Sequence, residues 1–263
     1  MSDVLIEATG VGKVLGRGAG EVQALKDINL ALSGGELTVL MGPSGSGKTT
    51  LLSVLGCMLT PTTGTVMVCG FSTEGADAEK LAKLRRDHVG FVFQQYHLFP
   101  TMTAAENVQL ALDVRGVRGK TARSRAREAL RKVGLEHKIK SYPGELSGGE
   151  QQRVAIARAI VSDPSVILTD EPTAALDGEN GQAIMRILAS IAGQSDRSVL
   201  VVTHDPRLLA FADRIVHIED GSLAREEAGK AGVAKSLSAA VKRGDFSKPD
   251  GSRRERGGAA NPE

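Results

Sequence analysis

The sequence is poor in aromatic residues and in cysteine. Its 263 residues include no tryptophan, two tyrosines, six phenylalanines and two cysteines. Two cysteines cannot form the disulfide framework of a small secreted domain, and the N-terminus has no signal-peptide pattern. We therefore expect Cys57 and Cys69 to be reduced, buried, small hydrophobic residues of a cytosolic protein.

Long hydrophobic runs are also absent. No segment approaches the ~18–20 consecutive apolar residues that a membrane-spanning helix needs. If the protein serves a membrane process, we expect the spanning part to belong to another chain. Hydrophobic residues make up 41% of the sequence and charged residues 24%, which is ordinary for a globular chain with one sizeable core, alone or with a smaller attached domain.

No charge of one sign dominates the composition. Thirty-three Lys and Arg residues oppose thirty-one Asp and Glu residues, for a net charge of +2, so global charge gives no argument for a nucleic acid or an anionic membrane as partner. A local basic excess between positions 115 and 132 lacks the interleaved aromatic residues of a nucleic-acid-binding surface. We favour a solvated helix face and expect no nucleic acid partner. The basic residues are Arg115, Arg118, Lys120, Arg123, Arg125, Arg127, Arg131 and Lys132.

The hydrophobic pattern changes twice along the chain. Residues 1 to about 95 alternate short β-like runs with glycine-rich turns, and residues 103 to about 140 show the three- and four-residue spacing of helices. Nearly all-apolar runs then return at 165–171, 198–205 and 214–221. Apolar strands that alternate with helices predict an α/β fold with a parallel sheet covered on both faces. The early runs expected to be strands are residues 4–8, 28–32, 37–41, 64–70 and 88–94.

The composition changes again after about Arg225. Residues 226–263 are rich in Ala, Gly, Ser, Lys and Arg and contain few large apolar residues. Val233, Leu237 and Val241 can align on one helical face, but about fifteen residues at the end have the composition of a disordered segment. We expect a polar tail that is at least partly disordered, and favour plain disorder over a regulatory or membrane-surface role.

The stretch GPSGSGKTT at positions 42–50 fits the pattern G-x-x-x-x-G-K-[ST] and follows the apolar run LTVLM. A strand, a glycine-rich turn and a helix start form the context that this phosphate-binding loop requires. Its glycines let backbone N–H groups point at the phosphates. Lys48 would reach the β- and γ-phosphates, and Thr49 would ligate Mg²⁺. The sequence therefore predicts an ATP site that contains Gly42, Pro43, Ser44, Gly45, Ser46, Gly47, Lys48, Thr49 and Thr50.

Two adjacent carboxylates, Asp170 and Glu171, end the apolar run SVILT. An aspartate at the end of a buried strand beside a phosphate loop is placed to hold Mg²⁺. A glutamate one residue later can accept a proton from the attacking water. Acidic pairs also end strands for solubility or helix capping, and it is the phosphate loop that makes the catalytic interpretation the stronger one.

Three further polar residues follow apolar runs, where ligands bind in open parallel sheets. Gln94 can touch Mg²⁺ or the lytic water, and His204 can hydrogen-bond the γ-phosphate or help to hold the water against Glu171. Asp177 ends TAALD just before a helical stretch. Taken singly, such residues are commonly a turn residue, a satisfied histidine and a helix N-cap. Their order and position favour functional roles, with Asp177 at an interface.

The stretch LSGGEQQRVAIARAI at 146–160 places a serine and two glycines directly ahead of an amphipathic helix. Backbone N–H groups freed by small residues at a helix start form an anion site. A second anion site is redundant if both sites serve one nucleotide bound by the same chain. It is not redundant if it donates to the γ-phosphate held by another copy. This signature segment consists of Leu146, Ser147, Gly148, Gly149 and Glu150.

The order of these motifs resembles that of the ATP-binding subunits of ABC transporters. The family's motifs occur here in the same order over about residues 4–225: the phosphate loop, Gln94, LSGGE, VILTDE, AALD and THD. The segment LSGGEQQR upstream of an apolar strand that ends in Asp-Glu is close to diagnostic of this family. The resemblance implies a P-loop NTPase cassette with a mainly parallel sheet core, an antiparallel β-subdomain and a helical subdomain at about 95–160. It also implies ATP hydrolysis with Mg²⁺, a head-to-tail homodimer on ATP, and a separate transmembrane permease that holds the chain on the cytoplasmic face of the plasma membrane.

Within the family, YPGELSGGEQQRVAIARA and THDPRLLAFADRIVHIEDG look like one branch, that of lipoprotein-release, macrolide-efflux, heterocyst-glycolipid-export and division-associated ATPases. The resemblance implies export or extraction of a lipophilic or lipoprotein-like substrate, with the permease docking near Phe99–Val108. Signalling to cell-wall enzymes and service as an importer subunit are the alternatives. A soluble DNA-repair or ribosome-acting ATPase is disfavoured, because the interval from Lys48 to Ser147 has no room for a long coiled coil and the chain has one cassette.

One position departs from the family pattern. The family usually places an aromatic ring, most often tyrosine, early in the chain to stack on adenine, and Leu15 stands at the expected place. Loss of such a stack costs on the order of 0.5–1.5 kcal/mol, although Leu15 and Val22 can still pack against the base. We therefore expect weaker discrimination of ATP from GTP than in relatives that carry tyrosine.

Overall fold

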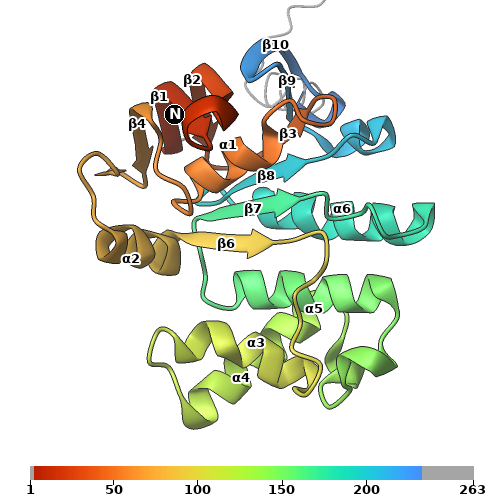
Figure 1. Ribbon diagram of the computed structural model, residues 1–263. Helices are drawn as coiled ribbons and strands as arrows, with labels where there is room; N and C mark the ends of the chain where they lie inside the picture. Colours follow the sequence, from red (N-terminus) through yellow and green to blue (C-terminus); the bar gives the residue numbers. More distant parts are fainter. Residues whose placement is uncertain (1–2, 233–263) are drawn as a thin grey trace, which may run out of the picture.

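The computed structural model describes residues 3–232, which form two β-sheets with helices around them (Figure 1). The strands are β1 (Val4–Leu15), β2 (Val22–Ser33), β3 (Glu36–Met41), β4 (Thr63–Val68), β5 (Phe71–Ser72), β6 (Val89–Val92), β7 (Val166–Asp170), β8 (Ser198–Val202), β9 (Arg214–Glu219) and β10 (Ser222–Ala228). The α-helices are α1 (Lys48–Leu55), α2 (Ala78–His88), α3 (Ala104–Asp113), α4 (Gly119–Lys132), α5 (Gly148–Ile160) and α6 (Gly178–Ala192).

The larger sheet has the strand order β10-β9-β3-β8-β7-β6. Strands β9, β3, β8, β7 and β6 run parallel, and only β10 pairs antiparallel to its neighbour β9. The prediction of a mainly parallel sheet is therefore confirmed. Because parallel strands point the same way, the segments that follow β3, β6, β7 and β8 leave from one edge of the sheet.

Both faces of this sheet are buried, as predicted from its apolar strands. Successive side chains of a strand point to opposite faces, so Val39 and Val201 pack into one core and Leu40 and Val202 into the other. The first core holds side chains of α3, α4, α5 and α6, and the second holds side chains of α1, β1 and β2. Burial of each of these large aliphatic side chains contributes about 1.5–3 kcal/mol.

The smaller sheet is antiparallel, with the order β2-β1-β4-β5. Strands β1 and β2 are twelve residues long, far longer than the runs expected at 4–8 and 28–32. The expected strands were too short because polar residues alternate with apolar ones along much of both strands, and glycine and lysine interrupt the pattern near positions 10–13. In the β1–β2 pairing, Leu15 lies opposite Val22.

Helices α3, α4 and α5 lie together below the larger sheet in Figure 1. Helix α4 packs through small residues, Ala122, Ala126 and Ala129, and its basic residues from Arg118 to Lys132 are exposed, as expected of a solvated face. Arg115 differs from them: its guanidinium donates to the carbonyls of Arg86 and Ser162.

Helix α2 was not predicted, and the alternation of short strands and turns expected for this part of the chain is wrong there. It buries only Leu81 and Leu84, so its sequence shows little of the three- and four-residue spacing of apolar residues that predicts a helix. A capping signal was present, because the Asp77 side chain accepts from the backbone N–H of Lys80 at 2.8 Å.

Both cysteines are free, with Cys57 buried and Cys69 partly buried. Burial raises the pKa of the Cys57 thiol to about 11, as in an unreactive cysteine.

The fold continues past the boundary expected at residue 225. Strand β10 runs to Ala228, and Gly229 and Ala231 donate to the carbonyls of Asp213 and Ala212. The expected helical face of Val233, Leu237 and Val241, and the expected disorder of the tail, lie outside the described residues. Within residues 3–232, every helix is too short or too polar to cross a bilayer.

Candidate active site

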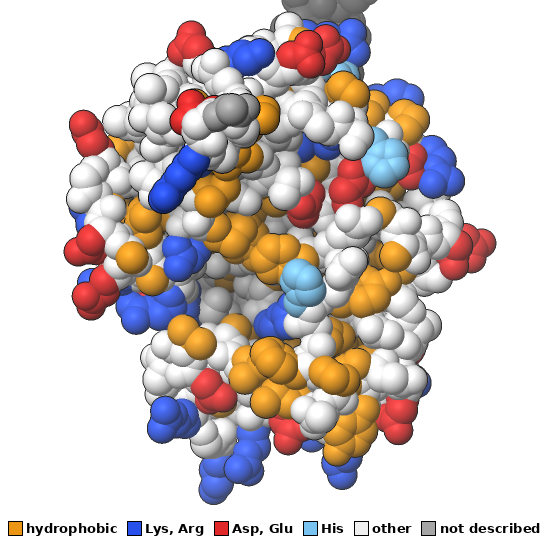
Figure 2. Space-filling model, in the orientation of Figure 1, with side chains coloured by type: hydrophobic (Ala, Val, Ile, Leu, Met, Phe, Trp, Pro, Cys, Tyr) orange, Lys and Arg blue, Asp and Glu red, His pale blue; other side chains and the backbone are white. Residues whose placement is uncertain are grey.

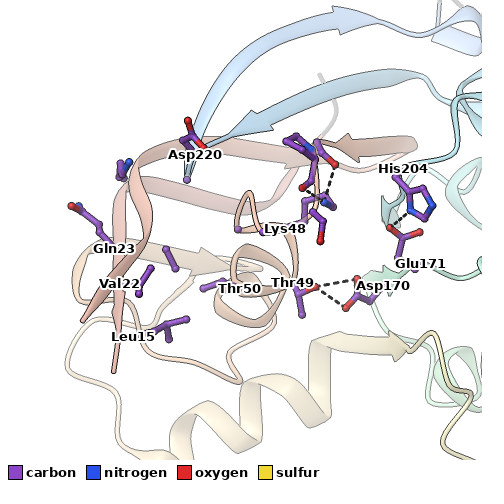
Figure 3. A pocket seen from close by; sticks show the side chains of 18 of the residues that line it. Leu15, Val22, Gln23, Lys48, Thr49, Thr50, Asp170, Glu171, His204 and Asp220 are labelled. Carbon is purple, nitrogen blue, oxygen red and sulfur yellow. Dashed lines mark hydrogen bonds and ion pairs between the residues drawn. The ribbon is translucent and has the colours of Figure 1, made fainter. Parts of the chain in front are cut away.

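A cavity of about 920 Å³ lies where β3, β7 and β8 end (Figure 3). Its volume is typical of a site that holds a small molecule. The loop between β3 and α1 forms one wall, the carboxylates after β7 a second, and the paired ends of β1 and β2 a third. Of the residues predicted to form one chain's own nucleotide site, only Ser46 does not line the cavity. Those that do are Leu15, Val22, Gly42, Pro43, Ser44, Gly45, Gly47, Lys48, Thr49, Thr50, Gln94, Asp170, Glu171 and His204.

The loop after β3 needs glycine for two physical reasons. Gly45 and Gly47 have φ angles of +79° and +100°, a region that residues with a side chain rarely adopt. At Gly42, a Cβ atom would lie 2.2 Å from the carbonyl oxygen of Ile218, so no side chain fits. The Nζ of Lys48 donates to the carbonyls of Gly42 and Pro43 at 2.9 and 2.7 Å, which holds the ammonium at the mouth of the loop.

The chemistry of the loop fits a phosphate group. Helix α1 begins after Gly47, which offers no side chain to cap the first turn. The first N–H groups of a helix have no partner within the helix and carry a partial positive charge. Backbone donors and an ammonium therefore converge where an anion would be bound.

Thr49 and Asp170 bring two oxygen ligands together beside this loop. The Thr49 Oγ1 atom lies 3.1 and 3.4 Å from the two carboxylate oxygens of Asp170. Burial, reinforced by the neighbouring charge of Glu171, raises the pKa of Asp170 against the opposing effects of Thr49 and Lys48. A cation would relieve the cost of burying the ionised carboxylate.

Thr49 and Asp170 suit a Mg²⁺ ion that takes its remaining ligands from outside the protein chain. Mg²⁺ prefers oxygen and usually takes one or two protein ligands, with water and phosphate oxygens completing its shell. Within residues 3–232, no group of three or more His, Cys, Asp and Glu residues is placed to hold a metal ion. The chain alone therefore offers a partial shell, which a bound phosphate would complete.

Glu171 and His204 form the polar pair at the end of the cavity. The His204 Nδ1 atom lies 2.8 Å from the Glu171 Oε1 atom. Because an ionised carboxylate only accepts, Nδ1 carries the proton in this pair. The Glu171 side chain is 16% exposed and that of His204 is 71% exposed, so the ring lies on the solvent side of the carboxylate.

The backbone of Glu171 is strained. Its φ angle is +48°, which costs about 1–3 kcal/mol for a residue with a side chain. Its N–H donates to the carbonyl of Val202 at 2.9 Å, and this bond to β8 helps to hold the conformation. The strain directs the carboxylate out of the strand and toward His204 (Figure 3).

Five lining residues were not predicted: Gln23, Ala24, Lys26, Asp220 and Gly221. The turn between β9 and β10 reaches the phosphate loop, since the Gly221 N–H donates to the Ser46 carbonyl at 3.1 Å and the Lys26 N–H to the Gly221 carbonyl at 2.7 Å. The Asp-Gly pair signals a tight hairpin turn. Nothing in the sequence says which loop that turn contacts.

The signature segment lies outside the cavity. None of Leu146–Glu150 is among its lining residues. Ser147 is the N-cap of α5: its Oγ accepts from the Glu150 N–H at 3.3 Å, while the Ser147 N–H donates to the Glu150 carboxylate at 2.8 Å. The Ser147 side chain is exposed. The structure thus separates the two anion sites that the sequence predicted within one chain.

Asp177 also lies away from the cavity lining, at the N-cap of α6. Its carboxylate accepts from the N–H of Asn180 and from its side-chain amide, both at 2.9 Å. These bonds lower the pKa of Asp177. A Cβ atom on Gly149 would lie 2.9 Å from the Asn180 Oδ1 atom, so this cap packs against the signature segment.

The model of the ABC transporter family matches residues 25–174, more than half of the chain. The chain belongs to the ABC transporter ATP-binding family. The cassette is 44% identical over 227 residues to the ABC transporter ATP-binding protein MJ0796 of Methanocaldococcus jannaschii, a match that covers 85% of this chain and 97% of that protein.

The cassette is also similar to export proteins that carry their own permease. It is 44% identical over 219 residues to the macrolide export ATP-binding/permease protein MacB of Salmonella typhimurium, which covers 83% of this chain and 34% of MacB. The cassette therefore spans about a third of the length of the MacB relatives that it matches.

Solved structures of relatives share the fold of the cassette. A dimeric structure of MJ0796, a post-hydrolysis state bound to ADP and Pi, matches with a TM-score of 0.78 and 43% identity, over 85% of this chain and 98% of that one. CbiO1 of Clostridium perfringens, part of the ABC transporter complex cbiONQ, matches with a TM-score of 0.78 at 26% identity, over 91% of this chain and 94% of that one. The predicted family and cassette fold are confirmed, and the protein is an ABC ATPase.

Proposed function

We propose that this ABC ATPase hydrolyses ATP with Mg²⁺ to power a separate transmembrane permease, on the cytoplasmic face of the plasma membrane. The observation that carries the proposal is that the motifs lie at two separate places on the chain. The phosphate loop, Asp170, Glu171 and His204 meet in one cavity, while the signature segment lies outside it. This is the arrangement expected of a motor that completes its active site only when two copies meet.

Each residue of the cavity has a role that its position supports. Lys48 and the backbone of residues 42–50 bind the phosphates. Thr49 and Asp170 hold Mg²⁺, which when bound offsets the negative charge of the phosphate oxygens. Glu171 accepts the proton of the attacking water at its carboxylate. His204 orients that carboxylate through its Nδ1–H, and Gln94 approaches the same region after β6.

The second half of the site comes from a second copy of the chain. In a head-to-tail homodimer, Ser147, Gly148 and Gly149 of one chain donate to the γ-phosphate held by the other. The exposed Ser147 and the N-terminus of α5 suit this contact. The related MJ0796 cassette was observed as a dimer. Asp177, next to the signature segment through Asn180, lies near the same interface.

The permease docks in an apolar groove between the larger sheet and the helices below it. Figure 2 shows hydrophobic side chains around a hollow beneath β6 in this view. The groove has a volume of about 470 Å³, enough to receive a few side chains of a helix from a membrane partner. It lies beside the stretch Phe99–Val108 that the sequence indicated. Its apolar lining residues are Val89, Phe91, Phe93, Phe99, Leu110, Ala111, Val114 and Ala159, and Arg86, His97, Arg158 and Ser162 are its polar ones.

The similarity to MacB supports export or extraction of a lipophilic or lipoprotein-like substrate as the transport reaction. Among the relatives, MacB joins a cassette and a permease in one protein, whereas MJ0796 is matched over 97% of its length by the cassette alone. Signalling in a division complex and import remain the alternatives, and the identity of the membrane partner separates them.

Recovery of the membrane partner tests the permease proposal. The tagged protein, purified from detergent-solubilised membranes, should retain a permease with four spans and a large extracytoplasmic domain. Phe99→Glu should reduce its recovery at least about tenfold, because a charge would be buried in the apolar groove. Phe71→Glu is the matched control: Phe71 is 52% exposed and Phe99 53%, but Phe71 does not line the groove. A six-span permease with a binding protein would instead identify an importer.

Leu15→Tyr should raise ATP affinity and widen the preference for ATP over GTP, each by about two- to tenfold. No Phe or Tyr lines the cavity within the described residues, and the exposed pair Leu15 and Val22 stands at its rim. Aliphatic side chains pack against a purine without fixing the plane of its ring. Calorimetric titration with both nucleotides measures the change.

Val4→Tyr is the control for this substitution, because Val4 is 48% exposed at the other end of the same strand, β1, and does not line the cavity. It should leave both affinities unchanged. If Leu15→Tyr also left both unchanged, the cavity rim would not be the base site.

A further inference from the structure

Helix α4 presents a row of basic side chains to the surface. Lys120, Arg123, Arg127 and Arg131 are exposed and follow one another at three- and four-residue spacing, so they share one side of the helix, here called the α4 face. Figure 2 shows Lys and Arg side chains gathered at the lower end of the molecule, where α4 lies in Figure 1. The net charge of the whole chain is only +2, so this basic face is a local concentration of charge.

Little within the chain offsets the charge of the α4 face. A solvated helix face usually mixes the two signs and forms ion pairs along the helix. Glu128 is the only acidic residue of α4, and it pairs with Arg131 at 2.7 Å. Within residues 3–232, Lys120, Arg123 and Arg127 form no ion pair. Like charges at this spacing destabilise a helix, and an external anionic partner would relieve their repulsion.

The start of α4 adds to the excess of positive charge. Its N-cap residue is Arg118, whose side chain makes no capping hydrogen bond, and its first turn contains no acidic residue. The N-terminal end of a helix carries a partial positive charge of its own. The repulsion along the α4 face and the charge at the helix start therefore both favour negative charge outside the chain.

The position of α4 is fixed relative to the groove proposed for the permease. Helix α4 packs against α3, which forms part of the groove wall. The Arg115 guanidinium, in the turn between the two helices, donates to the carbonyls of Arg86 and Ser162, and both of these residues line the groove. Val114, in the same turn, also lines the groove and is 70% exposed. The basic face and the groove thus belong to one continuous surface.

We propose that the α4 face contacts anionic lipid headgroups of the membrane whose permease occupies the groove. The inference rests on the proposed function, which places the cassette on the cytoplasmic face of that membrane. Anionic lipids give this leaflet a negative surface potential, which attracts clusters of Lys and Arg. The fourteen residues of α4 span about 21 Å, so the row of charges matches an extended anionic surface. Residues 113–133 contain no aromatic side chain to stack on a nucleic acid base.

Vesicles that contain no permease test the inference. At about 0.15 M salt, the unaltered protein should float with vesicles of phosphatidylcholine and phosphatidylglycerol, and should not float with vesicles of phosphatidylcholine alone. The combined substitutions Lys120→Gln, Arg123→Gln and Arg127→Gln should weaken binding at least about tenfold, because three charges leave the membrane surface. Glutamine is a good helix former, so α4 should persist, which circular dichroism checks.

Two control variants identify what the vesicles recognise. Arg17→Gln, Arg225→Gln and Lys230→Gln together remove the same charge from exposed residues near β1 and β10, which lie at the other end of the molecule from α4 (Figure 1). This variant should bind vesicles like the unaltered protein.

The second control combines Arg123→Lys with Arg127→Lys, which keeps the charge of the α4 face. It should bind vesicles within about twofold of the unaltered protein, because a lipid surface attracts point charges. A bidentate contact between arginine and a carboxylate would instead be weakened by lysine.

The complex with the permease gives a readout that simple attraction to vesicles would not move. Reconstituted with the same lipids, its ATP turnover should be higher when phosphatidylglycerol is present. The variant with Lys120→Gln, Arg123→Gln and Arg127→Gln should lose this difference and keep the turnover of the unaltered complex in detergent.

The outcomes separate the inference from the proposed function. The inference is overturned if the unaltered protein does not bind anionic vesicles, if both triple variants bind equally well, or if turnover ignores phosphatidylglycerol. It is also overturned if the α4 triple variant loses the permease in detergent, which would identify an acidic protein partner, or if the protein binds single-stranded DNA more tightly than vesicles. Failure of the proposed function would appear separately, as failure to recover any permease.

Discussion

Replacement of Glu171 by glutamine should abolish steady-state ATP hydrolysis while ATP stays bound, so that the variant accumulates as a dimer. An amide has nearly the same shape as the carboxylate but cannot accept the proton of the attacking water. Loss of a general base lowers the rate by about a hundredfold to ten-thousandfold, or about 3–5 kcal/mol in activation free energy. Phosphate release and gel filtration in MgATP measure the two effects.

Nucleotide binding by Glu171→Gln should be intact or tighter. The charge of Glu171 is one of the causes that raise the pKa of Asp170, so its removal favours the ionised Asp170 that would hold Mg²⁺. Retention of full ATPase activity would exclude Glu171 as the base. His204→Ala should cause a smaller loss of rate, because it removes the group that orients the base and leaves the base itself.

A second His–Glu pair supplies the control. The His217 Nε2 atom lies 3.1 Å from the Glu227 Oε1 atom, on β9 and β10, and neither residue lines the cavity. Glu227→Gln makes the same chemical change in a similar pair and should leave turnover unchanged. A comparable loss in this variant would mean that the effect of Glu171→Gln reflects folding and not proton transfer.

Ser147→Phe should likewise abolish hydrolysis, while ATP binding by the single chain stays nearly intact. Ser147 is exposed and lies outside the cavity, so a ring there cannot obstruct the chain's own phosphate loop. It would keep the start of α5 away from the partner's γ-phosphate. The substitution also removes the Ser147 cap of α5, which costs about 1 kcal/mol of stability.

The stability effect can be separated from the interface effect by Thr103→Phe. Thr103 forms the same reciprocal capping box with Glu106 at the start of α3, so the variant loses an equivalent cap outside the signature segment. It should lose a similar amount of stability and retain ATPase activity. Equal inactivation of both variants would assign the loss to helix capping.

Mixing two inactive variants tests the composite site directly. In a head-to-tail dimer of Ser147→Phe with Lys48→Ala, one site combines an intact phosphate loop with an intact signature segment, and the other site carries both defects. Activity should therefore reappear on mixing, at up to about half of the unaltered level per dimer if the sites turn over independently. If mixing restores nothing, the signature segment does not act on the partner's nucleotide.

The chemistry of the cavity was largely predictable from local sequence. The phosphate loop, Asp170 and Glu171 belong to short motifs whose spacing fixes their place at the ends of strands, and parallel strands bring those ends to one edge. Leu15 could be placed in the cavity only through the resemblance to the family, and the β1–β2 register explains its position opposite Val22. Ser46 was predicted as a lining residue, but it faces inward and is buried.

What escaped prediction depends on contacts between distant segments. Arg158 is one of many arginines in the sequence, and only the fold brings it to the carbonyls of Tyr96 and His97. The contact of Gly221 with the phosphate loop is equally non-local. Helix α2 was missed because it lies at the periphery and buries two leucines, so its pattern is too weak for periodicity to detect.

The place of β3 in the larger sheet affects how the protein is made. The strand that carries the phosphate loop has β8 and β9 as its neighbours, and the loop itself is braced by Gly221. All three partners are synthesised more than a hundred residues after the loop. A chain growing on the ribosome from its N-terminus thus carries its ATP-binding motif long before it can bind ATP. The site is complete only when residues beyond 221 have left the exit tunnel, so a chain truncated before that point carries the motif without a functional nucleotide site.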